Sequence, residues 1–199
     1  MRVIAGLGNP GDEYRGSRHN AGFLVVTGLA SEHAIRLAAG HDGSVSGTGR
    51  VAGQPVLLVL PQDFMNASGP PIARALEAAG AGHDDLLVVC DDIALPLGRL
   101  RLRASGSDGG HRGLRSVAGA LATERFARLR LGVGAPPDEG DAADYVLDRF
   151  GPDERAAVDA MVSKAIEAIA FLLARGIGQA MSVYNRWERS EDSMEPGEG

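Results

Sequence analysis

The sequence predicts one α/β domain in which a twisted, mixed β-sheet is flanked by α-helices. First, short apolar runs of strand length alternate along the chain with segments whose apolar residues recur every three or four positions. Second, several of these runs end in glycine or polar clusters, as strands before loops do. Third, 199 residues without repeats can form one core. We place the domain at 1–187 and an acidic, disordered tail at 188–199.

The first strand, at 2–7, leads into the turn Gly6-Leu7-Gly8-Asn9-Pro10-Gly11. Its glycine spacing matches the dinucleotide fingerprint, which requires a helix to begin in the turn and to aim amides at a pyrophosphate. Pro10 removes one amide and disfavours helical geometry at Asn9. We therefore favour a tight turn that presents Asn9.

The next elements are a helix, a hairpin and a second helix. Apolar spacing predicts a helix that begins near Asn20 and ends before Gly40. The glycine- and serine-rich segment 40–49 is predicted to be a mobile connection. Two strands should pair across Gly53-Gln54, and a helix should span about Pro70–Ala79.

The second half alternates strands and helices in the same way. Arginine and leucine alternate along one of the strands, which gives it a solvated, basic face. Gly176 marks the end of the longest helix. The predicted elements are a buried strand at 86–90, the basic strand at 98–103, a helix at 114–122, a strand at 129–133, a short segment of uncertain type at 144–150 and the long helix at 153–175.

Polar side chains gather on the loops that follow the strands. Loops at the carboxyl ends of strands in an open α/β sheet meet at one crevice. His19 and Asp91 would there provide an imidazole and an orienting carboxylate, the pair that activates a water molecule. Asn9 and Asn66 could donate hydrogen bonds to a developing oxyanion.

Each of these residues also has a structural interpretation. His19 could bond a backbone carbonyl, Asn9 could build its turn, and Asn66 could cap the next helix. Asp91-Asp92 could be a cap or a surface pair. Cys90 lies in an apolar strand and is interpreted as core, and five histidines without ligand spacing argue against a metal site.

The charge distribution matters more than the net charge of -6. The tail carries five acids against Arg189, which leaves it at -4 and the rest of the chain at -2. The segment 99–115 holds five arginines and one acid, Asp108. The acidic total can therefore hide a basic face that binds RNA phosphates, although such a strand face is also often merely solvated.

The single cysteine excludes an internal disulfide and fits a reducing cytoplasm. The apolar run at the amino terminus is too short for a signal peptide or a membrane span. We expect a cytoplasmic monomer that makes no membrane contact.

Several motifs follow one another over about residues 2–186: Gly6-Leu7-Gly8-Asn9-Pro10-Gly11 with Tyr14, Arg18-His19-Asn20, Phe64-Met65-Asn66, Asp91-Asp92, Gly109-Gly110-His111 and Arg128-Leu129-Arg130. In this order they resemble the bacterial-type peptidyl-tRNA hydrolase family. The resemblance implies hydrolysis of the ester between a peptide and the 3′-terminal ribose of tRNA, without a metal or other cofactor. It makes His19 the catalytic base and Asp91 its partner.

The resemblance assigns the other site residues as well. Asn9 and Asn66 would position substrate or water and stabilise the oxyanion. Substrate contacts would come from Tyr14, Met65 and His111, and tRNA phosphate contacts from Arg103 and Arg130. We add Arg112, which follows His111, to the expected substrate-binding residues.

The chain departs from the family at Arg112, where an asparagine is usual, and at Ala94, where an acid is usual. An arginine has no acceptor and always carries charge, so it cannot copy an amide. Two hypotheses follow: a hydrolase in which His19 activates water, and a catalytically weakened RNA-binding paralogue in which Arg112 adds phosphate affinity.

Overall fold

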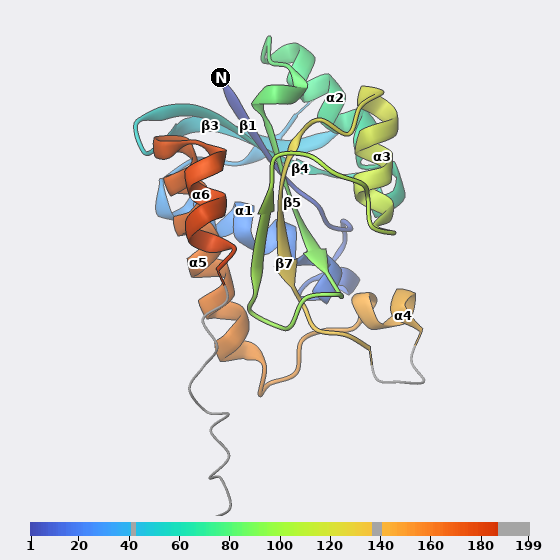
Figure 1. Cartoon of the computed structure of the whole chain (residues 1–199). Helices are drawn as coiled ribbons and strands as arrows, with labels where there is room; N and C mark the ends of the chain where they lie inside the picture. Colours follow the sequence, from blue (N-terminus) through green and yellow to red (C-terminus); the bar gives the residue numbers. More distant parts are fainter. Residues whose placement is uncertain (41–42, 137–140, 187–199) are drawn as a thin grey trace, which may run out of the picture.

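The computed structural model in Figure 1 describes residues 1–40, 43–136 and 141–186. Within these ranges the strands form one seven-stranded sheet in the order β2-β3-β4-β1-β5-β7-β6. The sheet is mixed, as predicted. The strands are β1 (Arg2–Gly6), β2 (Ala38–Ala39), β3 (Ser44–Val51), β4 (Gln54–Pro61), β5 (Leu86–Asp92), β6 (Leu100–Arg103) and β7 (Ala127–Gly132).

The four central strands run in the same direction. β1 lies between β4 and β5, and β5 also pairs with β7, all in parallel register. β3 and β6 pair antiparallel with β4 and β7. The carboxyl ends of the central strands therefore meet at one edge of the sheet, where Asp91 and Asp92 close β5.

Helices cover both faces of the sheet (Figure 1). One apolar core lies between the sheet and α1 and α5, and a second lies between the sheet and α2 and α3. The longer helices are α1 (Ala21–Glu32), α2 (Gly69–Ala78), α3 (Arg112–Leu121), α4 (Ala142–Leu147), α5 (Arg155–Arg175) and α6 (Ile177–Tyr184). None of the helices in the described ranges is both long and apolar enough to span a membrane.

The first turn of α1 rests directly on the sheet because it contains Gly22. A Cβ at Gly22 would lie 2.3 Å from the carbonyl oxygen of Val89 and 2.6 Å from the backbone of Leu7. This close approach fixes the short 3-10 turn η2 (Arg18–Asn20), which precedes α1, at the carboxyl edge of the central strands.

The prediction of a mobile connection at 40–49 is wrong for most of that segment, because β3 begins at Ser44 and pairs along its length with β4. Its glycines serve packing: a Cβ at Gly47 would lie 2.4 Å from the carbonyl oxygen of Arg36. Helix α1 is shorter than predicted and ends at Glu32.

The carboxyl-terminal part also differs in detail from the prediction. Asp144–Leu147 belongs to α4, and Glu154 is the residue before α5 rather than part of its first turn. Gly176, at φ +84°, ends α5 as predicted, and the sequence pattern did not reveal α6 after it. The predicted tail at 188–199 lies outside the described residues.

Candidate functional site

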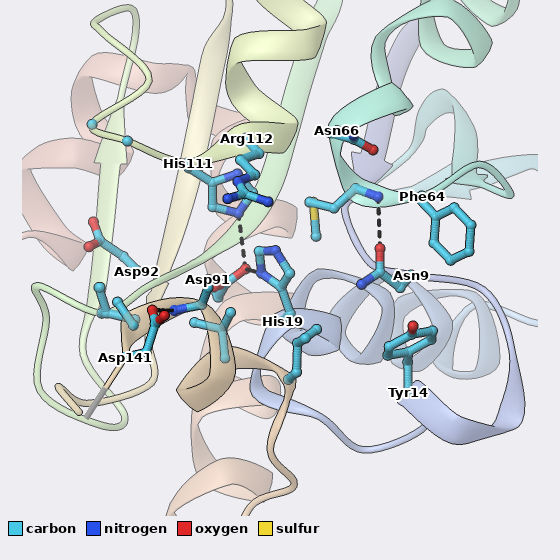
Figure 2. Close-up of a pocket in the computed structure, with 18 of the residues that line it drawn as sticks. Asn9, Tyr14, His19, Phe64, Asn66, Asp91, Asp92, His111, Arg112 and Asp141 are labelled. Atoms are coloured by element: carbon cyan, nitrogen blue, oxygen red, sulfur yellow. Dashed lines mark hydrogen bonds and ion pairs between the residues drawn. The ribbon is translucent and has the colours of Figure 1, made fainter. Parts of the chain in front are cut away.

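A pocket of about 600 Å³ opens at the carboxyl edge of the central strands (Figure 2). The turn after β1, the turn η2, the loop after β4, the end of β5, the loop before α3 and the helix α4 all contribute to it. It is lined by Asn9, Tyr14, His19, Phe64, Met65, Asn66, Asp91, Asp92, Ile93, Gly109, Gly110, His111, Arg112, Arg130, Asp141, Ala142, Ala143, Val146 and Leu147. The polar residues that the sequence placed on separate loops thus share one cavity.

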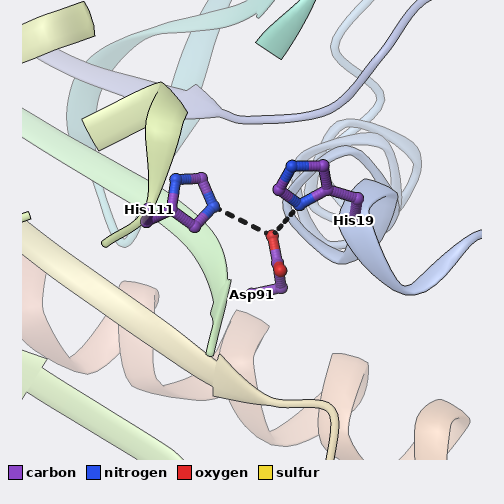
Figure 3. Close-up of side chains that lie close together, drawn as sticks. All are labelled: His19, Asp91 and His111. Carbon is purple, nitrogen blue, oxygen red and sulfur yellow. Dashed lines mark hydrogen bonds and ion pairs between the residues drawn. The ribbon is translucent and has the colours of Figure 1, made fainter. Parts of the chain in front are cut away.

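Two of the histidines that line this pocket meet one carboxylate (Figure 3). Nδ1 of His19 lies 2.8 Å from Oδ1 of Asp91, and Nε2 of His111 lies 3.0 Å from the same oxygen. Asp91 is buried, which favours a neutral carboxyl, but the contacts with His111 and His19 hold its pKa well below the ordinary value. The carboxylate is therefore charged at neutral pH.

The hydrogen bonds of the second ring nitrogen of His111 indicate the tautomer of its imidazole. Nδ1 of His111 accepts hydrogen bonds from the backbone amides of Gly113 and Leu114, at 3.1 and 3.2 Å, and so caps α3. An accepting nitrogen carries no proton, so Nε2 carries it and donates to Asp91. The cap on α3 thereby fixes the tautomer of His111.

Asp91 imposes the opposite tautomer on His19. The carboxylate can only accept, so Nδ1 of His19 donates to it, and Nε2 of the neutral ring is left as an acceptor at the pocket. An imidazole in this state can take a proton from water, and Asp91 stabilises the imidazolium that results.

His19, Asp91 and His111 are also a group that could hold a metal ion, since their ligand atoms lie within 4.8 Å of one another. The tautomer of His111 does not suit a metal. A metal on Nε2 would move the ring proton to Nδ1, which faces the amides of Gly113 and Leu114. The donor set fits a hydrogen-bonded network instead.

Asn9 is fixed by three hydrogen bonds. Its backbone N–H donates to Oδ1 of Asn20 at 2.8 Å, and its carbonyl accepts from Nδ2 of Asn20 at 3.0 Å. Its own Oδ1 accepts from the amide of Met65 at 2.7 Å (Figure 2). The side-chain oxygen is thus occupied, which leaves Nδ2 of Asn9 as the donor at the pocket.

Asn20 holds a site residue in place, which the sequence interpretation missed. The sequence predicts a helix cap there, and although Asn20 directly precedes α1 its side chain makes no capping bond. It clamps the backbone of Asn9 instead. The spacing of the His–Asn pair after the glycine turn was the available signal.

Asn66 does not cap the helix that follows it. The residue before α2 is Ser68, and the side chain of Asn66 is exposed at the pocket wall (Figure 2). Tyr14 and Phe64 form the neighbouring wall, with their rings in an edge-to-face contact at 6.4 Å between centroids. Cys90 is buried within β5, as predicted.

Two arginines of β7 hold the loop 104–110 that leads to His111. Arg130 donates to the carbonyls of Ser107 and Asp108, both at 3.0 Å, and pairs with Asp92 at 3.2 Å. Arg128 is buried and donates to the carbonyls of Gly106 and Ser107. These contacts give both arginines a structural role, whereas Arg103 on β6 is exposed.

Arg18 is a second residue that the sequence interpretation missed. Its guanidinium makes two hydrogen bonds to Glu154, at 2.9 and 2.7 Å, and one to the carbonyl of Val133 at 3.2 Å. It also lies over the rings of Tyr145 and Phe150. Arg18 thus ties the turn that carries His19 to α4, which lines the pocket, and to the start of α5.

Arg112, which departs from the family pattern, lies at the pocket. It is the first residue of α3, and Figure 2 shows its side chain beside His111, within the cavity rather than on the outer face of the sheet. Among the residues that the structure describes, Arg112 has no hydrogen-bond or ion-pair partner.

Comparisons with known proteins place the sequence and the fold of this chain among proteins of one description. The family described as "Peptidyl-tRNA hydrolase" matches residues 3–193. A protein named peptidyl-tRNA hydrolase from Lachnospira eligens is 44% identical over 93% of this chain and 100% of its own length. One from Carboxydothermus hydrogenoformans is 45% identical over 94% of this chain and 99% of its length. The crystal structure of peptidyl-tRNA hydrolase from Acinetobacter baumannii superposes with a TM-score of 0.88 at 32% identity, covering 94% of this chain and 96% of that one.

Proposed function

The chain belongs to the peptidyl-tRNA hydrolase family, and we propose that it cleaves the ester between a peptide and tRNA with a water molecule activated by His19. The observation that carries the proposal is the 2.8 Å contact between His19 Nδ1 and Asp91 Oδ1. It leaves Nε2 of His19 as a base at the pocket, where ester and water can meet.

The reaction follows from this arrangement. His19 Nε2 takes one proton from water as the water oxygen bonds to the ester carbonyl carbon, and the negative charge develops on the carbonyl oxygen. The amide donors of Asn9 and Asn66 stabilise that oxyanion. When the bond to the ribose 3′ oxygen breaks, the imidazolium returns the proton to it. The other proton of the water is released to solvent as the acid product ionises, so the products are a peptide carboxylate and tRNA with a free terminal hydroxyl.

We also propose that no metal takes part. Asp91 and the two histidines are already joined by hydrogen bonds, and the cap on α3 opposes a metal at His111. Activation of water then depends on His19, and charge stabilisation depends on the asparagines.

The tRNA would approach over β6 and β7. Arg101 faces Arg130 across the antiparallel pair and Arg103 faces Arg128, so all four side chains share one face of the sheet. Arg103 is the most exposed of them, so we propose it as a phosphate contact. Arg130 lies on the same face but already pairs with Asp92 and with loop 104–110. It would keep these partners while it contacts a phosphate. We propose a monomer acting in the cytoplasm.

Hydrolysis of an N-blocked aminoacyl-tRNA by the intact chain tests the proposal. We expect turnover that survives treatment with a chelator and falls by at least about 10³-fold in His19→Ala. Absence of turnover by the wild-type chain, or full turnover by His19→Ala, would contradict it. A loss of turnover with the chelator that added metal restores would contradict the metal-free part alone.

A second candidate function is RNA binding with weakened catalysis, and the position of Arg112 in the pocket favours it. It predicts tRNA binding with a steep salt dependence and little hydrolysis. Arg112→Asn separates the two. A gain in turnover together with weaker tRNA binding would support the binding protein, and unchanged turnover and binding would remove its support.

A further inference from the structure

Arg112 is set apart by charge from the other residues that line the pocket. Asp91 is hydrogen-bonded to His19 and His111, Asp92 is paired with Arg130, and Asp141 caps α4 by accepting from the amide of Ala143 at 2.8 Å. Among the described residues of the lining, Arg112 is the cation without a partner. A permanent charge in this position attracts an anionic group of whatever enters the pocket.

The wall that carries Arg112 continues into the basic face of the sheet. Gly109 and Gly110 line the pocket and belong to the loop whose carbonyls Arg130 holds. Arg130 itself lines the pocket and lies opposite Arg101 on β6. A polynucleotide bound on the basic face therefore reaches the cavity along this wall, and Arg112 lies beyond the glycines, beside His111.

The remaining walls are largely apolar. Phe64, which is 59% exposed, and Tyr14 form one of them, and Val146 and Leu147 of α4 form another. They suit uncharged groups of the acyl part of a substrate. The pocket thus has one cationic wall, with His19 and Asn9 between it and the aromatic wall (Figure 2).

We propose that Arg112 is a specificity-determining residue that binds the phosphodiester joining the last two nucleotides of the tRNA, an inference that rests on the proposed function. The ester bond is uncharged and the esterified peptide has no terminal carboxylate. The permanent negative charge closest to the bond that breaks is therefore the 5′-phosphodiester of the terminal nucleotide. A guanidinium is positively charged and can bind two oxygens of a phosphodiester at once. The side-chain amide of an asparagine is neutral and lacks this charge.

Two ester substrates test this directly. One is the N-acetylaminoacyl ester of cytidylyl-adenosine, which contains the phosphodiester, and the other is the same ester of adenosine, which does not. We expect the ratio of their kcat/KM values to fall roughly tenfold in Arg112→Asn and by an intermediate factor in Arg112→Lys. With full-length substrate, the slope of log KM against log salt should become shallower by about 0.7, the value expected when one phosphate is no longer neutralised.

Arg36→Asn is the matched control, because Arg36 is exposed and lies outside the pocket, near β2 at the other edge of the sheet. It removes the same charge and should leave the ratio as in the wild type. An unchanged ratio in Arg112→Asn would overturn the inference. If both kcat/KM values fell equally, Arg112 would act on the ester or on the fold and not on the phosphodiester.

A binding measurement separates failure of this inference from failure of the proposed function. Calorimetry compares adenosine 5′-methylphosphate, which is a phosphodiester, with adenosine. The wild-type chain should prefer the diester and Arg112→Asn should lose that preference, whether or not any ester is cleaved. Equal affinity of the wild-type chain for both ligands would refute the role of Arg112 even in an active hydrolase.

Discussion

Nε2 of His111 lies 3.0 Å from Oδ1 of Asp91, the same carboxylate oxygen that faces Nδ1 of His19. Because the other nitrogen of His111 caps α3, the ring reaches Asp91 only as a donor. One oxygen of Asp91 therefore accepts hydrogen bonds from two imidazoles with opposite tautomers. The ring of His111 is fixed by α3, and the ring of His19 faces the pocket.

This arrangement predicts the protonation pattern of both rings. Long-range ¹H–¹⁵N correlation spectra at neutral pH should show His111 protonated at Nε2 and His19 protonated at Nδ1. In Asp91→Asn, His19 should lose its fixed tautomer while His111 keeps Nδ1 free for the helix. A proton on Nδ1 of His111 in the wild-type chain would contradict the assignment.

Substitution of His111 should separate its cap from its contact with Asp91. His111→Ala loses both, and we expect a loss of about 1 kcal/mol in unfolding free energy from the cap. His111→Asn can restore the cap but not the donor to Asp91. Both variants remove the donor that His111 offers to Asp91, so kcat/KM should fall because the carboxylate that orients His19 is held less firmly. Wild-type kcat/KM in His111→Asn would show that only the cap matters.

Asn20 and Asn185 make the same two-point clamp in different places. Asn185 accepts from the amide of Leu102 at 2.7 Å and donates to its carbonyl at 2.9 Å, just as Asn20 does with Asn9. Either Ala variant should lose about 1–3 kcal/mol of stability. Only Asn20→Ala should also lose activity, about 10- to 100-fold, because Asn9 shifts. Equal activity in both variants, measured well below their melting temperatures, would refute a positioning role for Asn20.

The sequence predicted the residues of the site better than it predicted their contacts. Asp91 and His19 could be paired because a buried strand ends at Asp91 and a glycine turn precedes His19. The contact between His111 and Asp91 could not, because it depends on the path of loop 104–110. That path uses positive φ angles at Gly106, Gly109 and Gly110 and the arginines of β7.

In the fold as well, some elements could be predicted from the sequence and others could not. Apolar periodicity predicted the central strands and α5, whose residues face the two cores. The hairpin across Gly53-Gln54 was predicted, but only the end of β3 next to it, because glycines that permit close packing at Gly47 and Gly49 look like a flexible linker in the sequence. Arg18 was missed for a related reason: its partner Glu154 is 136 residues away, and no local pattern connects them.

Gly22 should not tolerate a side chain. In Gly22→Ala the new Cβ would meet the backbone of Val89 and Leu7, which cannot rotate away. We expect a loss of about 1–3 kcal/mol in unfolding free energy and a fall in activity, because η2 and His19 move with α1. Gly178→Ala is the control, since Gly178 lies within α6 and a Cβ there meets nothing within 4 Å. It should be neutral or stabilising by up to about 1 kcal/mol, and thermal melts of both variants check the difference.

The ion pair between Arg18 and Glu154 should stabilise the fold in a pH-dependent way. The side chain of Arg18 is 9% exposed, and its hydrogen bonds hold the pKa of Glu154 below the ordinary value. The contribution is therefore complete above the unfolded pKa of about 4.3 and is lost as the pH falls through the lower, folded pKa. Arg18→Met should cost about 3 kcal/mol of unfolding free energy at pH 7, less at pH 3, and reduce kcat because η2 loosens.

Arg15→Met, which removes an exposed pair with Asp12, should change stability by less than about 1 kcal/mol at either pH. Denaturant melts at both pH values decide the outcome: equal costs for Arg18→Met at pH 7 and pH 3 would show that packing on Tyr145 and Phe150, and not the charge, makes Arg18 important.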